Sequence, residues 1–104
     1  MMGHNTKLYR AVSNDEYNSI VSNLYKFSYF PNAMEMKWFA TSIKHVKIWG
    51  DLLYKNESYK IIVINIPKES LKHMYYVKFL DGIGPAYAAD VESLNKFVKK
   101  VRLL

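Results

Sequence analysis

The chain has 104 residues, half of them hydrophobic, and a formal net charge of +6 at pH 7. A chain of this length can bury one hydrophobic core but not two, so we expect a single domain over residues 1–104. Cysteine is absent, which excludes disulfides, a thiolate metal site and a cysteine nucleophile.

The rest of the composition bears on metals, membranes and partners. His4, His45 and His73 show no paired spacing, so we predict no metal site. The sequence has no run of about 18 apolar residues and no signal-peptide pattern, so we expect a soluble chain without an export signal or a membrane partner. The positive charge favours an anionic partner, which is a dinucleotide, a nucleic acid or an acidic protein surface. Basic residues that are spread along a chain, as here, more often only form a solvated surface.

The first elements are a strand and a helix. Residues 7–12 alternate as in a strand, with Arg10 on the same face as the apolar residues two positions away. Ser13 and Glu16 then form a capping-box pattern, in which the Ser13 hydroxyl accepts from the Glu16 amide and the Glu16 carboxylate returns to the Ser13 amide. Apolar residues follow at helical spacing, which predicts a helix from about residue 14 to 24.

The middle of the chain predicts a loop, a strand and a second helix. The aromatic segment 25–35 contains the turn signal Pro31-Asn32 and is expected to be a loop that leads into a strand at 37–41. Ser42 is placed to cap the second helix, in which Gly50 is tolerated at some cost. The apolar stripe of this helix consists of Ile43, Val46, Trp49 and Leu53.

The third part predicts a central strand and shorter elements. Residues 59–66 are almost continuously apolar and rich in β-branched side chains, which predicts a central strand that ends at Pro67. A short helix at 68–74, a strand at 75–80 and a turn-rich loop at 81–85 follow.

The C-terminal part allows two interpretations. Asp90 caps a helix that runs through Lys100, or residues 97–104 form a last strand. The order of strands and helices fits an α+β domain rather than a doubly wound parallel sheet. Gly82 and Gly84 agree with this, because they lack the third glycine and the following helix of a dinucleotide-binding fingerprint.

Four segments, taken together and in this order, carry a resemblance. They are Leu8-Tyr9-Arg10-Ala11-Val12-Ser13 before the capped helix, Met34-Glu35-Met36-Lys37-Trp38-Phe39-Ala40-Thr41-Ser42, Ile48-Trp49-Gly50 within the second helix, and Leu80-Asp81-Gly82-Ile83-Gly84-Pro85-Ala86. The chain resembles small ADP-ribosyltransferase-like toxin domains from about residue 8 to 95. Such domains often form the C-termini of large bacterial toxins used in competition between cells.

The resemblance implies a fold, an activity and partners. The fold is a small ADP-ribosyltransferase-like α+β fold with mixed, mostly antiparallel sheets and two to three helices. The activity is that of a mono-ADP-ribosyltransferase toxin, which transfers ADP-ribose from NAD to an acidic protein acceptor or a nucleic acid. An immunity protein is a further partner that the family implies. The location is the cytoplasm, or the cytoplasm of a target cell that a larger toxin reaches.

The resemblance also assigns NAD-binding residues. Arg10, beside Tyr9, takes the place of a strand arginine whose planar fork holds phosphate oxygens. The structural alternative for Arg10 is an ion pair with a carboxylate. The aromatic rings of Trp38 and Phe39 are expected to seat nicotinamide, and the hydroxyls of Thr41 and Ser42 to brace the pocket.

The aromatic and hydroxyl stretch also departs from the family pattern and has a structural alternative. Ala40 stands where the family often has Ser. Ser42 has an equally good role as a helix cap, with Trp38 and Phe39 in the core.

The catalytic acid of the family is a late acidic residue, usually Glu, that stabilises positive charge on the ribose. The candidates in this chain are Glu92 and Asp90, which share a face if the segment is a strand. Either is alternatively a helix cap or an acid in a first helical turn. Two functions compete with transfer: hydrolysis of NAD, and a catalytically inactive binding module that uses its basic surface and its tyrosines to hold nucleic acid or a protein.

Overall fold

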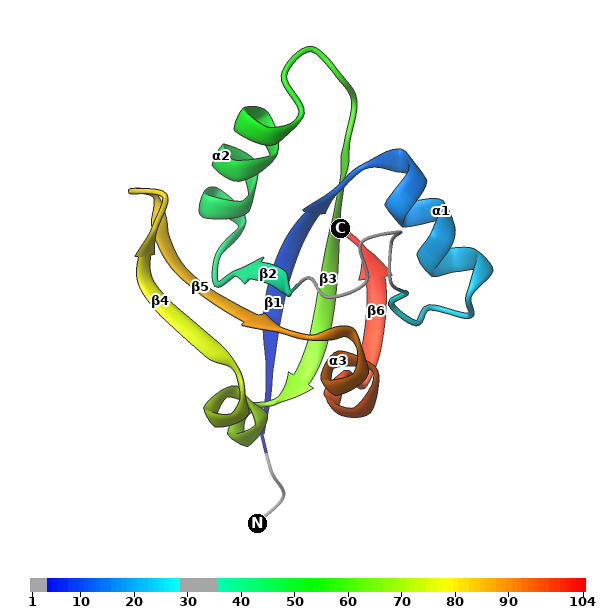
Figure 1. The fold of residues 1–104 in the computed structure, drawn as a ribbon, viewed down its shortest axis with the longest axis vertical. Coiled ribbons are helices and arrows are strands. Elements are labelled where there is room, and N and C mark those ends of the chain that lie inside the picture. The colour runs from blue at the N-terminus through cyan, green and yellow to red at the C-terminus, as the bar shows by residue number, and fades with distance from the viewer. Residues whose placement is uncertain (1–3, 29–35) are drawn as a thin grey trace.

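The computed structural model of the protein describes residues 4–28 and 36–104. In this part of the chain the strands form one six-stranded antiparallel sheet with the order β4-β5-β2-β1-β3-β6 (Figure 1). The strands are β1 (Asn5–Val12), β2 (Lys37–Ala40), β3 (Lys60–Pro67), β4 (Tyr75–Leu80), β5 (Gly84–Ala89) and β6 (Lys100–Leu103). The helices are α1 (Asn14–Ser22), α2 (Ile43–Leu53), α3 (Val91–Phe97) and the 3-10 helix η1 (Lys68–His73). The predicted α+β class is therefore correct, and the strands belong to a single sheet.

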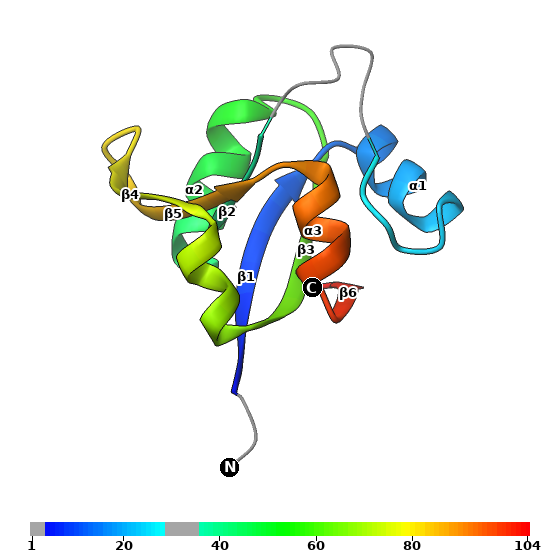
Figure 2. The ribbon, with the colours of Figure 1, turned by 60° about the horizontal axis from the view of Figure 1, so that its bottom comes forward.

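The sheet separates two hydrophobic layers. Leu8 and Val12 of β1 belong to the larger cluster, which contains residues of α1 and α3. Ala11 belongs to the smaller cluster, in which Trp49 of α2 is buried. Because neighbouring residues of a strand point to opposite faces, α2 covers one face of the sheet and α1 and α3 cover the other. Figure 2 shows α2 and α3 on opposite sides of the strands.

The capped helices form where the sequence predicts them. Helix α1 follows Ser13, whose hydroxyl accepts a hydrogen bond from the Glu16 amide at 3.0 Å. It ends at Ser22, earlier than expected, because Leu24 and Tyr25 have left-handed backbones with φ of 56° and 62°. The predicted turn at Pro31-Asn32 lies outside the described residues.

Strand β3 contributes four fully buried residues to the core, as its apolar run predicts. Ile62, Val63, Ile64 and Ile66 are each at most 1% exposed. The strand lies between β1 and β6, so both of its edges are paired in the sheet. The predicted short helix and the strand at 75–80 are present as η1 and β4.

Strand β5 was not predicted, because residues 81–85 read as a loop. Asp81 and Gly82 both have positive φ, 55° and 72°, and the Ile83 amide donates to the Leu80 carbonyl at 2.9 Å. Such backbones are typical of the two central residues of an Asp-Gly hairpin turn, which together with Ile83 connects β4 to β5. Pro85 is accommodated in the strand because the pairing of β4 with β5 is irregular between Val77 and Leu80.

The C-terminal alternatives are both present in part. Asp90 caps α3, which ends at Phe97, and β6 begins at Lys100. The strand interpretation of the segment that holds Asp90 and Glu92 is therefore wrong, because the Asp90 carboxylate satisfies the free amide of Ser93 and starts a helix.

The predicted stripe of α2 is only half buried. Val46 and Trp49 lie in the core, whereas Ile43 and Leu53 are 39% and 66% exposed. A Cβ atom at Gly50 would overlap the ring of Tyr59, so any larger residue there requires this ring to move.

Candidate functional site

A pocket of about 320 Å³ lies between α2, the central strands and the β4–β5 turn. This volume is at the lower end of the range for small-molecule sites. The pocket wall is mainly apolar and carries the aromatic side chains of Tyr9, Trp38 and Trp49. Arg10 and Phe39 also contribute atoms to it, so four of the six predicted NAD-binding residues reach this cavity. The Phe39 ring, however, is buried against Phe27 in the cluster on the other face of the sheet, so the expectation that it seats nicotinamide is not met.

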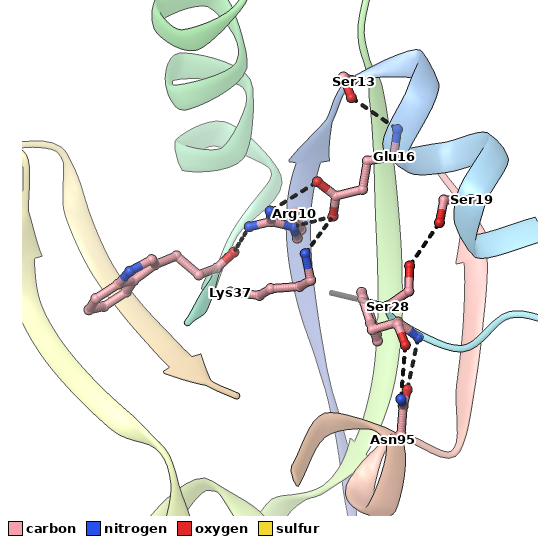
Figure 3. A network of polar contacts seen from close by, with 9 residues as sticks. Arg10, Ser13, Glu16, Ser19, Ser28, Lys37 and Asn95 are labelled. Carbon is pink, nitrogen blue, oxygen red and sulfur yellow. Dashed lines mark hydrogen bonds and ion pairs between the residues drawn. The ribbon is translucent and has the colours of Figure 1, made fainter. Parts of the chain in front are cut away.

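The β1 residue Arg10 is held by a carboxylate of α1 and by the backbone of β2. Its Nε donates to Glu16 Oε2 at 2.8 Å and its Nη2 donates to Glu16 Oε1 at 3.1 Å (Figure 3). Its Nη1 donates to the Trp38 carbonyl at 3.1 Å. The structural alternative for Arg10, an ion pair with a carboxylate, is thus present. Three of the five N–H groups of the guanidinium have partners in the described part of the chain, and the side chain is 18% exposed.

Glu16 is the functional candidate that sequence reasoning missed. Its carboxylate was expected to return to the Ser13 amide, but it binds Arg10 instead, and Lys37 Nζ lies 3.7 Å from Oε2. A bidentate pair with a guanidinium is stronger than one hydrogen bond to a neutral amide, which explains why the Glu16 carboxylate binds Arg10 rather than the Ser13 amide. Glu16 is 5% exposed and Lys37 is 1% exposed. The alternation of β1 shows only that Arg10 faces the α1 side; its partner comes from tertiary packing.

The hydroxyl residues after β2 stand apart from the pocket wall. Ser42 caps α2, since its hydroxyl accepts from the His45 amide at 3.2 Å. Thr41 is half-buried, and neither residue is among those that line the pocket. Of the two roles expected for Ser42, helix cap and pocket wall, the helix cap is therefore the one that a hydrogen bond supports.

The predicted acids Asp90 and Glu92 lie at the start of α3. Asp90 accepts from the Ser93 amide at 2.7 Å, and this hydrogen bond holds the pKa of the Asp90 carboxyl below its usual range. Glu92 is exposed in the first turn of the same helix. Neither is among the residues that line the pocket at α2.

The carboxylate that does line this pocket belongs to Asp81. It lies in the β4–β5 turn, and its Oδ2 accepts from Trp49 Nε1 at 3.0 Å. This hydrogen bond joins the turn to α2 across the pocket. The Asp-Gly pair in the sequence predicts the turn that contains Asp81, but it does not predict the hydrogen bond of Asp81 with Trp49.

The pKa of Tyr54, which lies at the C-terminal end of α2, depends on burial and on the charges of Glu16 and Arg10. Burial raises the pKa of its hydroxyl, and the Glu16 carboxylate raises it further. The Arg10 guanidinium and a hydrogen bond with the Ser13 backbone act in the opposite direction. The ring stacks on Tyr59 with 5.6 Å between the centroids, so α2 and the start of β3 are tied together beside the network.

No protein-family model matches the chain, and no curated protein or solved structure is significantly similar to it. Within residues 4–28 and 36–104, His, Asp and Glu side chains do not gather in a group of three that could hold a metal ion. In the same described part, no helix is both long and apolar enough to cross a membrane.

Proposed function

We propose that the pocket beside α2 binds the nicotinamide end of NAD and that the protein transfers ADP-ribose to a macromolecular acceptor. The observation that carries the proposal is the meeting of Tyr9, Arg10 and Trp38 at one cavity. Aromatic rings in a mainly apolar wall suit a flat heteroaromatic ring, which buries well and stacks. Two of the five guanidinium N–H groups of Arg10 have no partner among the described residues, and they are the donors for a ligand phosphate.

The reaction breaks the bond between C1′ of the ribose and the nicotinamide nitrogen. The electron pair of this bond leaves with nicotinamide, which becomes neutral, and positive charge develops on C1′ and the ring oxygen. A nucleophilic oxygen or nitrogen of the acceptor then attacks C1′ and loses its proton. A carboxylate close to the ribose stabilises the positive charge in the transition state.

Within this proposal, Asp81 takes the role of the acid. It is the carboxylate in the pocket wall, and the Trp49 indole orients it through Oδ2. Asp90 is engaged as a helix cap and Glu92 points from an exposed helical turn. The exposed turn of Asp81 also leaves room for an acceptor, because Asp81 and Gly82 are both at the surface.

The experiment is incubation of the protein with NAD that is labelled in the adenylate half, with and without a bacterial protein extract. We expect release of nicotinamide and label on macromolecules. Asp81→Asn should reduce the rate at least about 100-fold, as loss of a transition-state contact does. Asp90→Asn and Glu92→Gln are matched controls of the same chemistry. A rate that falls with either control but not with Asp81→Asn would overturn the assignment of the acid.

Two other outcomes decide between the competing functions. Free ADP-ribose without labelled acceptor would make the protein an NAD hydrolase and would contradict the transferase proposal. An inactive protein that still binds NAD would be a binding module with the same pocket. Only the transferase accumulates label that resists denaturation of the protein.

A further inference from the structure

A second, larger groove lies away from the α2 pocket, between the end of α1 and the edge strand β6. Its volume is about 590 Å³. Four cations line it, namely Lys26, Lys99, Lys100 and Arg102, and none of the twelve described residues that line it is acidic. Four of the fifteen basic residues of the chain thus gather at one groove, which predicts an anionic occupant.

The floor of the groove includes an open sheet edge. Among the described residues, strand β6 is the last strand in the sheet order and pairs with β3 on one side alone. An outer strand offers a row of backbone N–H and C=O groups on its free side, which is a template for another strand. The residues of β6 alternate, with Val101 buried and Lys100 and Arg102 exposed.

The opposite wall holds apolar side chains toward solvent. Leu24 is 84% exposed and Tyr25 is 49% exposed, and both have left-handed backbones. Two consecutive non-glycine residues in this conformation are costly, and such strain is concentrated at functional sites. Across the groove, Leu103 of β6 is 46% exposed.

The wall is also fixed before any partner arrives. Asn95 of α3 binds the backbone of Phe27 twice: its Oδ1 accepts from the amide at 2.8 Å and its Nδ2 donates to the carbonyl at 2.9 Å. The hydroxyls of Ser19 and Ser28 are 2.8 Å apart and join the loop to α1 (Figure 3). A preformed groove loses little entropy when it binds.

We propose that this groove binds an extended acidic peptide segment, which adds to β6 as a further strand. The free strand edge supplies main-chain hydrogen bonds, the cations attract carboxylates, and Leu24, Tyr25 and Leu103 contact apolar side chains of the peptide. A single-stranded nucleic acid is disfavoured. It binds by stacking on several exposed rings, whereas Tyr25 is the one exposed ring among the described residues of this groove, since Phe27 is buried and Tyr17 is half-buried.

The proposal does not rest on the NAD chemistry and is tested without NAD. The assay is fluorescence anisotropy with three labelled probes at low salt: an eight-residue peptide of alternating Glu and Val, the same peptide with Lys for Glu, and an oligothymidylate. We expect saturable binding of the Glu/Val peptide alone, and affinity that falls as salt is added. Absence of binding, or tighter binding of the Lys/Val peptide or the oligonucleotide, would overturn the proposal.

Two further comparisons separate the charge of the groove from its strand edge. The double variant Lys26→Glu/Lys100→Glu should weaken binding of the Glu/Val peptide at least about tenfold. The control Lys44→Glu/Lys72→Glu has the same change in net charge at exposed residues outside the groove and should bind as the parent does. Equal losses in both double variants would contradict a local site.

N-methylation of every second amide of the peptide tests the strand edge and leaves its charge unchanged. One of the two alternating methylation patterns should abolish binding, because only one set of amides faces β6. Unchanged binding of both methylated peptides would show that no strand is added.

Discussion

Replacement of Glu16 by Gln tests whether the buried ion network of Glu16, Arg10 and Lys37 stabilises the fold. The Glu16 carboxylate is 7% exposed and lies 2.8 Å from Arg10 Nε and 3.7 Å from Lys37 Nζ. Gln keeps the shape but removes the negative charge, so Arg10 loses the carboxylate that it binds with two hydrogen bonds and Lys37 loses an acidic neighbour. Removal of one partner from a buried ion pair costs about 3–5 kcal/mol. For a domain of about 100 residues, this corresponds to a decrease in Tm of more than about 10 °C.

The assay is urea unfolding followed by far-UV circular dichroism, with Glu92→Gln as the control. Glu92 is an exposed acid in a first helical turn, and its neutralisation should change the free energy of unfolding by less than about 0.5 kcal/mol. A double-mutant cycle with Arg10→Gln should give a coupling energy of at least about 1 kcal/mol, because the two side chains share two hydrogen bonds. A loss of less than about 1 kcal/mol for Glu16→Gln would refute the reasoning.

Three further predictions concern packing and pH. Gly50→Ala should lower the free energy of unfolding by about 1–3 kcal/mol in urea denaturation, because the added Cβ would overlap the Tyr59 ring. A higher free energy of unfolding for this variant would show that the helix accepts alanine at this position. The pKa of Asp90 is lower in the folded protein than in the unfolded chain, so the carboxylate stabilises the fold above the usual carboxyl pKa. This stability is lost as the pH falls through the lowered pKa, so Asp90→Asn should flatten the acid side of the profile of Tm against pH. An unchanged acid side of this profile would contradict the prediction. The pKa of Tyr54 is higher in the folded protein than in the unfolded chain. The protonated hydroxyl therefore adds its full contribution to the free energy of unfolding below the usual tyrosine pKa of about 10, and this contribution is lost as the pH rises through the raised pKa. Tyr54→Phe should therefore lose less stability than the parent protein between about pH 9 and 12, and an identical alkaline profile would contradict the shift.

The local features of the fold could be predicted from the sequence because they depend on residues close together in the chain. The hydroxyls of Ser13 and Ser42 cap the helices that follow them, and four of the five β-branched residues of β3 are buried. The Asp-Gly pair at 81–82 carries a hairpin signal as well, but Pro85, three residues after Gly82, favours a loop. The irregular pairing of β4 with β5 that accommodates this proline is not encoded in a local pattern.

The candidate site was predictable only in part, because its decisive contacts are long-range. The alternation of β1 places Arg10 on one face, but it does not reveal that Glu16 reaches it from α1. The pairing of Trp49 with Asp81 joins residues 32 positions apart. Asp90 and Glu92 followed from family order alone, and the helix that Asp90 caps gives them a local role that sequence spacing left open.

The pocket beside α2 contains both tryptophans of the chain, Trp38 and Trp49, so their fluorescence reports directly on its occupancy. The measurement that tests the central claim is a titration with NAD followed by tryptophan fluorescence, for the parent protein, Tyr9→Ala and Tyr75→Ala. Tyr9 lines the pocket, whereas Tyr75 is 70% exposed on the edge strand β4. We predict saturable quenching that Tyr9→Ala weakens at least about tenfold and Tyr75→Ala leaves unchanged, since loss of an aromatic contact in a ligand pocket costs more than about 1.4 kcal/mol. Fluorescence of the folded parent protein that does not respond to NAD would contradict the account.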